Sequence, residues 1–216
     1  MDWLRHSHST QLRAWLLVCL CWCPVGFEPG LYGQEPSAWP LFRGNSAGTG
    51  VAACELPEQL EPLWTFDAAD TFFAATAAIV DGVVYIGDAE NKFYALALET
   101  GKQLWSREVE LGFLGSAAVR DGRVVAGDSD GVIHCMDART GATLWEQKTE
   151  AEINSSPNFF KQSVLIGSQN GTLYRLDLKD GKIIWEYTIE ASGGIQCAPS
   201  LEGKHTFVCG CDGKLH

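Results

Sequence analysis

Short runs of apolar residues alternate with polar turns along this chain, and the alternation recurs about every 40 residues. Residues 83–88 (Val-Val-Tyr-Ile-Gly-Asp) correspond to residues 123–128 and again to residues 163–168. Each unit holds four runs rich in β-branched and aromatic residues, separated by Asp-Gly, Asn-Gly or Thr-Gly turns, which predicts strands joined by tight hairpins. Helical periodicity is absent throughout. The pattern predicts an all-β chain of repeated four-stranded antiparallel sheets.

A tryptophan closes each unit, and the four tryptophans follow one another at intervals of 41, 40 and 40 residues. Units of four strands that repeat with this period are typical of β-propeller blades. The first run of each unit begins with small residues, which fits a strand near a crowded central axis. The repeat tryptophans are Trp64, Trp105, Trp145 and Trp185. The repeat glycines are Gly87, Gly127, Gly167 and Gly210 after the second run, and Gly101, Gly141 and Gly181 in the turn before the last run.

Residues 95–105 (Ala-Leu-Ala-Leu-Glu-Thr-Gly-Lys-Gln-Leu-Trp) resemble the repeat of pyrroloquinoline quinone (PQQ) type propellers. Residues 136–145 and 176–185 match the same pattern, and residues 39–44 are similar to the Trp-Pro-x-Phe-Arg-Gly opening of secreted bacterial members. The resemblance covers roughly residues 63–216. It implies a propeller like that of BamB or of the quinoprotein alcohol dehydrogenases, in which the Trp packs between adjacent blades and the Gly makes the preceding turn.

Three parts are expected along the chain: a signal peptide (1–33), a mostly irregular lead-in (34–62) and a partial PQQ-like propeller (63–216). The expected blades span about 74–109, 114–149, 154–189 and, incomplete, 196–216. A lone Trp-bearing strand at residues 63–66 is expected before the first complete blade. About three and a half blades fall short of the seven or eight that the resemblance implies. We expect a truncated form or, alternatively, a ring that a partner chain completes; open apolar blade faces would then favour self-association.

The first residues have the features of a secretory signal peptide. Arg5 and Arg13 flank a polar start, and the apolar core at residues 14–23 is too short to span a bilayer, which needs about 20 residues. Cleavage is expected before Gln34, with Gly26 as an alternative site. We therefore predict an exported protein, periplasmic or secreted, with no membrane span. A lipid anchor is not expected, because each cysteine of this segment follows a bulky residue.

The composition is acidic, with 16 Lys and Arg against 27 Asp and Glu and a net charge of −11. Such a surface argues against binding to nucleic acid or to anionic membranes. Residues of hydrophobic type make up 46% of the chain, which is enough to build a core.

Five cysteines lie beyond the predicted signal peptide, and an odd number leaves at least one unpaired within the chain. A bridge between Cys197 and Cys211 is one option, because both lie in the incomplete fourth unit. Cys209 and His216 add further soft ligands there. Alternation along a strand turns neighbours to opposite faces, however, and the spacing fits no zinc template. No metal site is predicted.

Three functions remain open at this stage. The first, which we favour, is a noncatalytic scaffold that binds a protein partner, as the resemblance to BamB implies, with no cofactor. The second is part of a quinoprotein dehydrogenase, with PQQ and calcium on the axis and carboxylate and amide oxygens around the metal. The third is an inactive fragment. No catalytic, cofactor-binding or metal residue is predicted. Candidate binding-face residues lie between blades or between second and third strands: Asp88, Asp128, Ser168, Phe113, Asn154 and Gln196.

Overall fold

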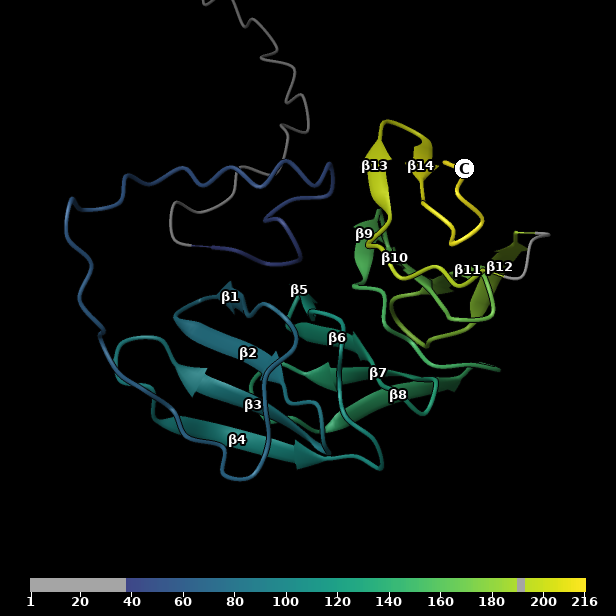
Figure 1. Cartoon of the computed structure of the whole chain (residues 1–216). Coiled ribbons are helices and arrows are strands. Elements are labelled where there is room, and N and C mark those ends of the chain that lie inside the picture. The colour runs from purple at the N-terminus through teal and green to yellow at the C-terminus, as the bar shows by residue number, and fades with distance from the viewer. Residues whose placement is uncertain (1–37, 190–192) are drawn as a thin grey trace, which may run out of the picture. The chain divides into compact units, whose positions relative to one another are not determined.

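The structure is a computed structural model that describes residues 38–189 and 193–216. The predicted signal peptide lies outside these residues. Within them, 14 strands form three four-stranded sheets and one two-stranded sheet, all antiparallel and in chain order (Figure 1). The described residues contain no helix. The all-β prediction and the incomplete propeller are therefore confirmed.

We call the four sheets units 1 to 4, and the first three repeat the same strand lengths. Unit 1 comprises β1 (Ala78–Val80), β2 (Val83–Gly87), β3 (Lys92–Ala97) and β4 (Gln103–Glu108). Unit 2 comprises β5 (Ala118–Arg120), β6 (Arg123–Gly127), β7 (Val132–Asp137) and β8 (Thr143–Lys148). Unit 3 comprises β9 (Asn158–Phe160), β10 (Ser163–Gly167), β11 (Thr172–Asp177) and β12 (Ile183–Thr188). Unit 4 comprises only β13 (Ser200–Glu202) and β14 (His205–Phe207).

The hairpins form where the sequence supplies residues that accept a left-handed backbone. The turn between β1 and β2 has φ of 51° at Asp81 and 73° at Gly82, and the turn between β5 and β6 repeats it at Asp121 and Gly122. Two consecutive residues with positive φ are the mark of the type I′ turn, whose twist matches that of the flanking strands. In units 1 and 2 this turn connects the first strand to the second.

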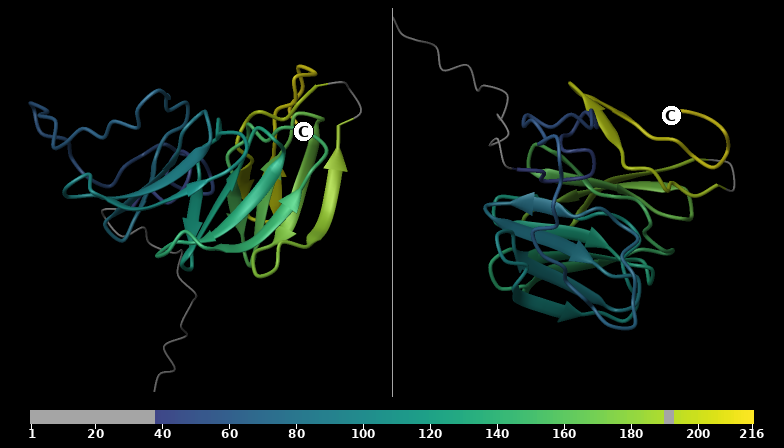
Figure 2. Two further views of the ribbon diagram at one scale, coloured as in Figure 1. Left: turned by 90° about the horizontal axis from the view of Figure 1, so that it is seen from below. Right: turned by 60° about the vertical axis from the view of Figure 1, so that its left-hand side comes forward.

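The short first strands β1, β5, β9 and β13 gather at one side, and β4, β8 and β12 lie outward (Figure 1). Figure 2 shows that the sheets follow one another as blades packed face against face. The tryptophans fill the space between the blades. Trp105 of unit 1 donates its indole N–H to the carbonyl of Ala138 in unit 2 at 3.0 Å, and Trp145 of unit 2 donates to Leu178 in unit 3 at 3.0 Å.

A glycine makes room for each of these indoles. A Cβ at Gly141 would lie 2.6 Å from the Trp105 ring, and a Cβ at Gly181 would lie 2.5 Å from the Trp145 ring. Trp64 packs on Gly101 in the same way, although residues 63–66 form no strand. Among the described residues, no strand pairs with residues 63–66, so the expected lone strand does not form in this structure. The indole of Trp64 contacts Gly101 although Trp64 does not belong to a strand.

Unit 4 pairs one residue out of step with the alignment that the sequence suggests. Cys209 bridges Leu215, as Gly167 pairs with Leu173 in unit 3. Cys209, and not Gly210, therefore occupies the position of the repeat glycine that ends the second strand. The assignment of Gly210 is wrong because hairpin pairing sets the register, and a one-residue shift in it changes which face each side chain meets.

Candidate functional site

The lead-in forms a strap, residues 39–46, that crosses the first strands of all four units. Trp39 exchanges two backbone hydrogen bonds with Ile79 of β1, at 2.7 and 2.9 Å. The Pro40 carbonyl accepts the Val119 N–H at 2.7 Å, and the Ser46 carbonyl accepts the Leu201 N–H at 2.9 Å. Each partner is the middle residue of its strand. The strap thus satisfies backbone groups at sheet edges that would otherwise lack partners.

Asn158 joins the strap to unit 3. Its side-chain amide donates to the Ser46 carbonyl at 2.8 Å and to the Pro199 carbonyl at 2.7 Å, while its Oδ1 accepts the Phe159 N–H at 2.8 Å. The side chain is buried, so these three bonds satisfy groups that water does not reach. Units 1 and 2 have an alanine at the same strand position.

A glycine also shapes the strap itself. Gly44 has φ of 83°, and a Cβ there would lie 2.9 Å from the Trp39 ring. The Trp-Pro-x-Phe-Arg-Gly sequence therefore encodes a turn that folds its last residue under its first.

Hydroxyl groups link the segments that lead into the first strands of units 1, 2 and 3. The Thr76 N–H donates to Ser116 Oγ at 3.1 Å, and the Ser116 N–H donates to Ser156 Oγ at 2.9 Å. Thr76 and Ser116 also share a hydrogen bond between their hydroxyl groups at 2.8 Å. Ala198 has the equivalent place before β13, so this hydroxyl ladder ends at unit 3. The spacing of 40 residues between its members marks this ladder in the sequence.

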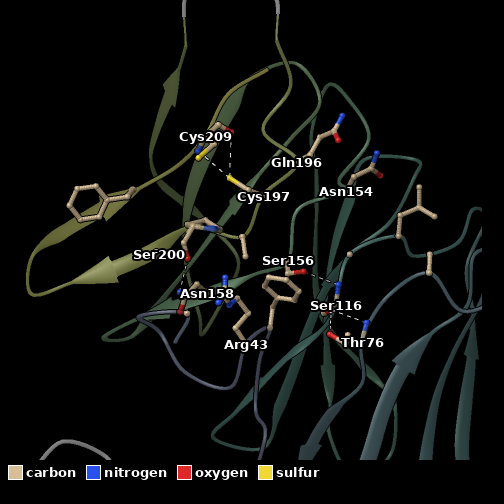
Figure 3. Close-up of a pocket in the computed structure, with 18 of the residues that line it drawn as sticks. Arg43, Thr76, Ser116, Asn154, Ser156, Asn158, Gln196, Cys197, Ser200 and Cys209 are labelled. Carbon is tan, nitrogen blue, oxygen red and sulfur yellow. Dashed lines mark hydrogen bonds between the residues drawn. The ribbon is translucent and has the colours of Figure 1, made fainter. Parts of the chain in front are cut away.

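A cavity of about 490 Å³ lies beside the ladder and the strap, and we call it the axial cavity (Figure 3). Its wall includes Arg43 of the strap, the amides of Asn154 and Gln196, and the thiols of Cys197 and Cys209. Two of the six predicted binding-face residues, Asn154 and Gln196, are therefore brought together at one site. The ladder residues, Asn158 and Arg43 complete it, and sequence reasoning did not find them.

The lining of the axial cavity combines apolar and polar side chains. Four lining residues are exposed apolar side chains: Phe42 at 36%, Leu114 at 38%, Phe207 at 43% and Leu215 at 68%. Hydroxyls and amides also line the space, and Arg43 is the single formally charged residue of the described lining. Such a wall can hydrogen-bond neutral polar groups and also contact apolar ones. It offers no carboxylate or imidazole to move a proton.

The axial cavity does not fit PQQ with calcium. Calcium takes six to eight oxygen ligands, usually with carboxylates among them. The described lining supplies hydroxyl and amide oxygens but no Asp or Glu. Throughout residues 38–189 and 193–216, no group of three or more His, Cys, Asp and Glu side chains could hold a metal ion.

The structure buries the side chains of the other four predicted binding-face residues, and their role in binding stays a prediction. Asp88 and Asp128 are 1% exposed, and Ser168 and Phe113 are fully buried. Asp88 explains why: its Oδ1 accepts backbone N–H groups of residues 90, 91 and 92 at 3.0, 2.9 and 2.9 Å. These bonds hold the Asp88 carboxylate against its own turn. Phe113 packs on Gly87, where a Cβ would lie 2.5 Å from it.

Titratable groups elsewhere serve the packing of the units. Tyr94 donates its hydroxyl to Asp88 Oδ2 at 3.0 Å, and burial together with this carboxylate raises the pKa of Tyr94 to about 12. In unit 2 the equivalent residue is His134, held by Asp128 at 2.7 Å and by Glu146 at 3.1 Å. Glu146 also pairs with Arg107 of unit 1 at 2.7 Å. This chain of contacts ties two blades together and occupies both nitrogens of the imidazole.

Comparison with solved structures shows the same fold in three kinds of protein. BamB from Moraxella catarrhalis matches with a TM-score of 0.65 and 24% identity, over 70% of this chain and 51% of that one. The quinohemoprotein alcohol dehydrogenase from Comamonas testosteroni matches with a TM-score of 0.71 and 19% identity, over 81% of this chain and 35% of that one. The computationally designed Ika4 protein matches with a TM-score of 0.65 and 19% identity, over 73% of this chain and 97% of that one. This chain thus spans about half the length of that BamB.

Sequence comparison gives the family. No curated protein sequence matches the chain. In the part of the chain that the structure describes, no helix has the length and apolar character needed to cross a membrane. A profile of the family described as outer membrane protein assembly factor BamB matches residues 57–210, well over half of the chain. The chain belongs to this family of PQQ-like β-propellers.

Proposed function

We propose that this chain is part of an exported, noncatalytic propeller that acts as a protein-binding scaffold. The family is described as an outer membrane protein assembly factor, and this description supports a role in binding other proteins. The features of a signal peptide in residues 1–33 support export. The net charge of −11 agrees with a partner that is neither nucleic acid nor an anionic membrane.

The observation that carries this proposal is the chemistry of the axial cavity. Four exposed apolar side chains line the axial cavity together with hydroxyls and amides. Protein interfaces combine apolar contacts with a limited number of hydrogen bonds, and they need no proton-transfer group. An extended segment of a partner could place apolar side chains on Leu114 and Phe207 while its backbone bonds to Asn154 and Gln196.

Site-specific photo-crosslinking tests the scaffold role in cells that produce the protein. A benzoylphenylalanine at Leu114 should crosslink to one discrete protein. The matched control is the same group at Leu144, an equally apolar residue on the outer strand β8, with 46% exposure against 38% at Leu114. Equal crosslinking from both positions, or none from Leu114, would contradict a partner site at the axial cavity.

A dehydrogenase is the second candidate, because the quinohemoprotein alcohol dehydrogenase shares the fold over 81% of this chain with a TM-score of 0.71. The purified chain would be mixed with PQQ and calcium and assayed for dye-linked oxidation of primary alcohols. We expect no turnover above a control without protein, because the described lining lacks carboxylates for calcium. Clear turnover would replace the scaffold proposal with the enzymatic one.

A further inference from the structure

Two cysteines of unit 4 occupy positions that hold small residues in the other units. By strand register, Cys209 stands where units 1, 2 and 3 have the repeat glycine, and Cys197 stands three residues before the first strand. The pairs at these two places are Ala75 with Gly87, Gly115 with Gly127, and Ser155 with Gly167. Both members of one such pair are cysteine only in unit 4.

The space around Cys209 differs from that around the repeat glycines. A Cβ at Gly127 would lie 2.0 Å from Ile153, and a Cβ at Gly167 would lie 2.3 Å from Ile195, because a residue of the following unit packs there. Among the described residues, none of a following unit packs in this way beside Cys209, which is exposed. A thiol therefore fits in unit 4 where it would be excluded from units 2 and 3.

The side chain of Cys197 is directed at Cys209 (Figure 3). The Cys209 N–H donates to Cys197 Sγ at 3.1 Å, and the Cys197 thiol donates to the Cys209 carbonyl at 3.4 Å. Cys197 precedes β13 and Cys209 follows β14, so the two segments that extend this hairpin place the Cys197 sulfur beside the Cys209 backbone. No such contact joins Cys197 to Cys211, whose N–H instead donates to the Gly194 carbonyl at 3.1 Å.

We propose that Cys197 and Cys209 form a redox-active cross-strand pair that is oxidised to a disulfide at the mouth of the axial cavity. The oxidant is a small-molecule or protein disulfide, and glutathione disulfide serves as the probe. The exposed Cys209 thiol loses its proton and attacks one sulfur of the oxidant, which releases one glutathione. Cys197 then loses its proton and attacks Cys209 Sγ, which releases the second glutathione. In total, the two cysteines give two electrons and two protons to glutathione disulfide, which is reduced to two molecules of glutathione.

The difference in exposure between the two thiols fits this order of events. Burial is the largest cause that raises the pKa of the Cys197 thiol, so Cys197 stays protonated at neutral pH more than an exposed cysteine. Cys209 and Cys211 are both exposed, and Cys135 is buried with its pKa raised to about 12. By exposure alone, either Cys209 or Cys211 could be the thiol that attacks the oxidant. Only Cys209 is in contact with Cys197, and this contact distinguishes the two.

A disulfide here would strengthen the smallest sheet of the chain. Unit 4 has two strands, and the bond would close a loop from before β13 to beyond β14. Closing such a loop restricts the unfolded chain. We expect the thermal midpoint of the oxidised protein to be about 5 °C above that of the reduced protein.

Peptide mapping after oxidation identifies the bond. The full chain is incubated with glutathione disulfide, remaining thiols are alkylated, and the protein is digested with trypsin without reduction. Cleavage after Lys182, Lys204 and Lys214 separates the two partners, so the expected product is peptide 183–204 linked to peptide 205–214. Because Cys209 and Cys211 share the second peptide, Cys209→Ser and Cys211→Ser are compared with the parent chain.

The proposal requires the linked peptides in the parent chain and in Cys211→Ser, and their loss in Cys209→Ser. The rise in thermal midpoint should occur in the parent chain and in Cys211→Ser but not in Cys209→Ser, and dithiothreitol should abolish it. Tryptophan fluorescence of the reduced variants verifies that each is folded. A link that survives in Cys209→Ser but is lost in Cys211→Ser, or no link in the parent chain, overturns the proposal. Neither result bears on the scaffold role, which crosslinking at Leu114 tests separately.

Discussion

Unit 2 and unit 4 share one sequence pattern, yet their surroundings differ. Unit 2 receives the indole of Trp105 on one side and sends Trp145 into unit 3 on the other. Within the described residues, unit 4 has two strands and a cysteine at the repeat-glycine position, and no glycine packs on Trp185, which is half-buried. Trp105 and Trp145 each bond to the next unit, whereas the hairpin of unit 4 is held by the backbone pairing of β13 with β14. We therefore expect the insertion of each tryptophan into its neighbour to stabilise a complete blade.

The largest effect is expected from removing an inserted indole. Trp145→Ala should lower the free energy of unfolding by about 3–5 kcal/mol, because a large buried side chain leaves a cavity. Trp185→Ala should cost less than about 2 kcal/mol, because its ring is only partly removed from water. Chemical denaturation of both variants would measure the difference. Equal losses would show that insertion into a neighbouring unit is not what stabilises the blades.

A smaller effect is expected from closing the space for an indole. Gly141→Ala should cost about 2–4 kcal/mol, because it adds left-handed backbone strain to a clash with Trp105. Gly122→Ala is the matched control, with φ of 69° and no atom within 4 Å of the new methyl group. It should cost only the backbone strain, about 1–2 kcal/mol. If thermal unfolding finds the two variants alike, the clash contributes nothing.

The strap should contribute less than the indoles. Asn158→Ala removes three hydrogen bonds in a buried site and should cost about 1–3 kcal/mol. Hydrogen exchange should increase at the Leu201 and Phe159 amides, which lie at the strap. The control is Asn45→Ala, whose side-chain bonds to Thr49 are exposed and should be worth under about 1 kcal/mol. If hydrogen exchange at these amides stays unchanged in Asn158→Ala, the asparagine does not hold the strap in place.

The smallest effect concerns pH. Burial raises the pKa of Cys135 from its usual 9.0 to about 12, so the unfolded chain releases this proton first as the pH rises. Between these two values the folded state binds more protons, and stability therefore falls with rising pH, by roughly 1 kcal/mol per unit at most. Cys135→Ala should show a weaker decline between pH 9 and pH 10; alanine is the natural residue at the equivalent place in unit 1. An identical decline in both proteins would assign it to other groups.

Much of the fold could be predicted because its signals are local. Thr-Gly and Asp-Gly dipeptides specify turns within a few residues, and Trp105, Trp145 and Trp185 recur at the blade period. The site could be predicted only in part. Asn154 and Gln196 were placed in inter-blade loops by position alone, whereas Asp88 and Phe113 occupy similar loops and are buried. Which loop residue faces the axis depends on contacts with the next unit, and no local pattern encodes these contacts.

The sequence by itself determined the repeat, the antiparallel hairpins and the family, because hairpin turns and indole spacing are properties of short segments. Only the tertiary structure decided the register of unit 4, the path of the strap across four first strands and the contact of Cys197 with Cys209. Each of these joins residues distant in the chain through backbone groups, which every residue carries alike. Their pairing therefore depends on the fold and leaves little trace in the order of side chains.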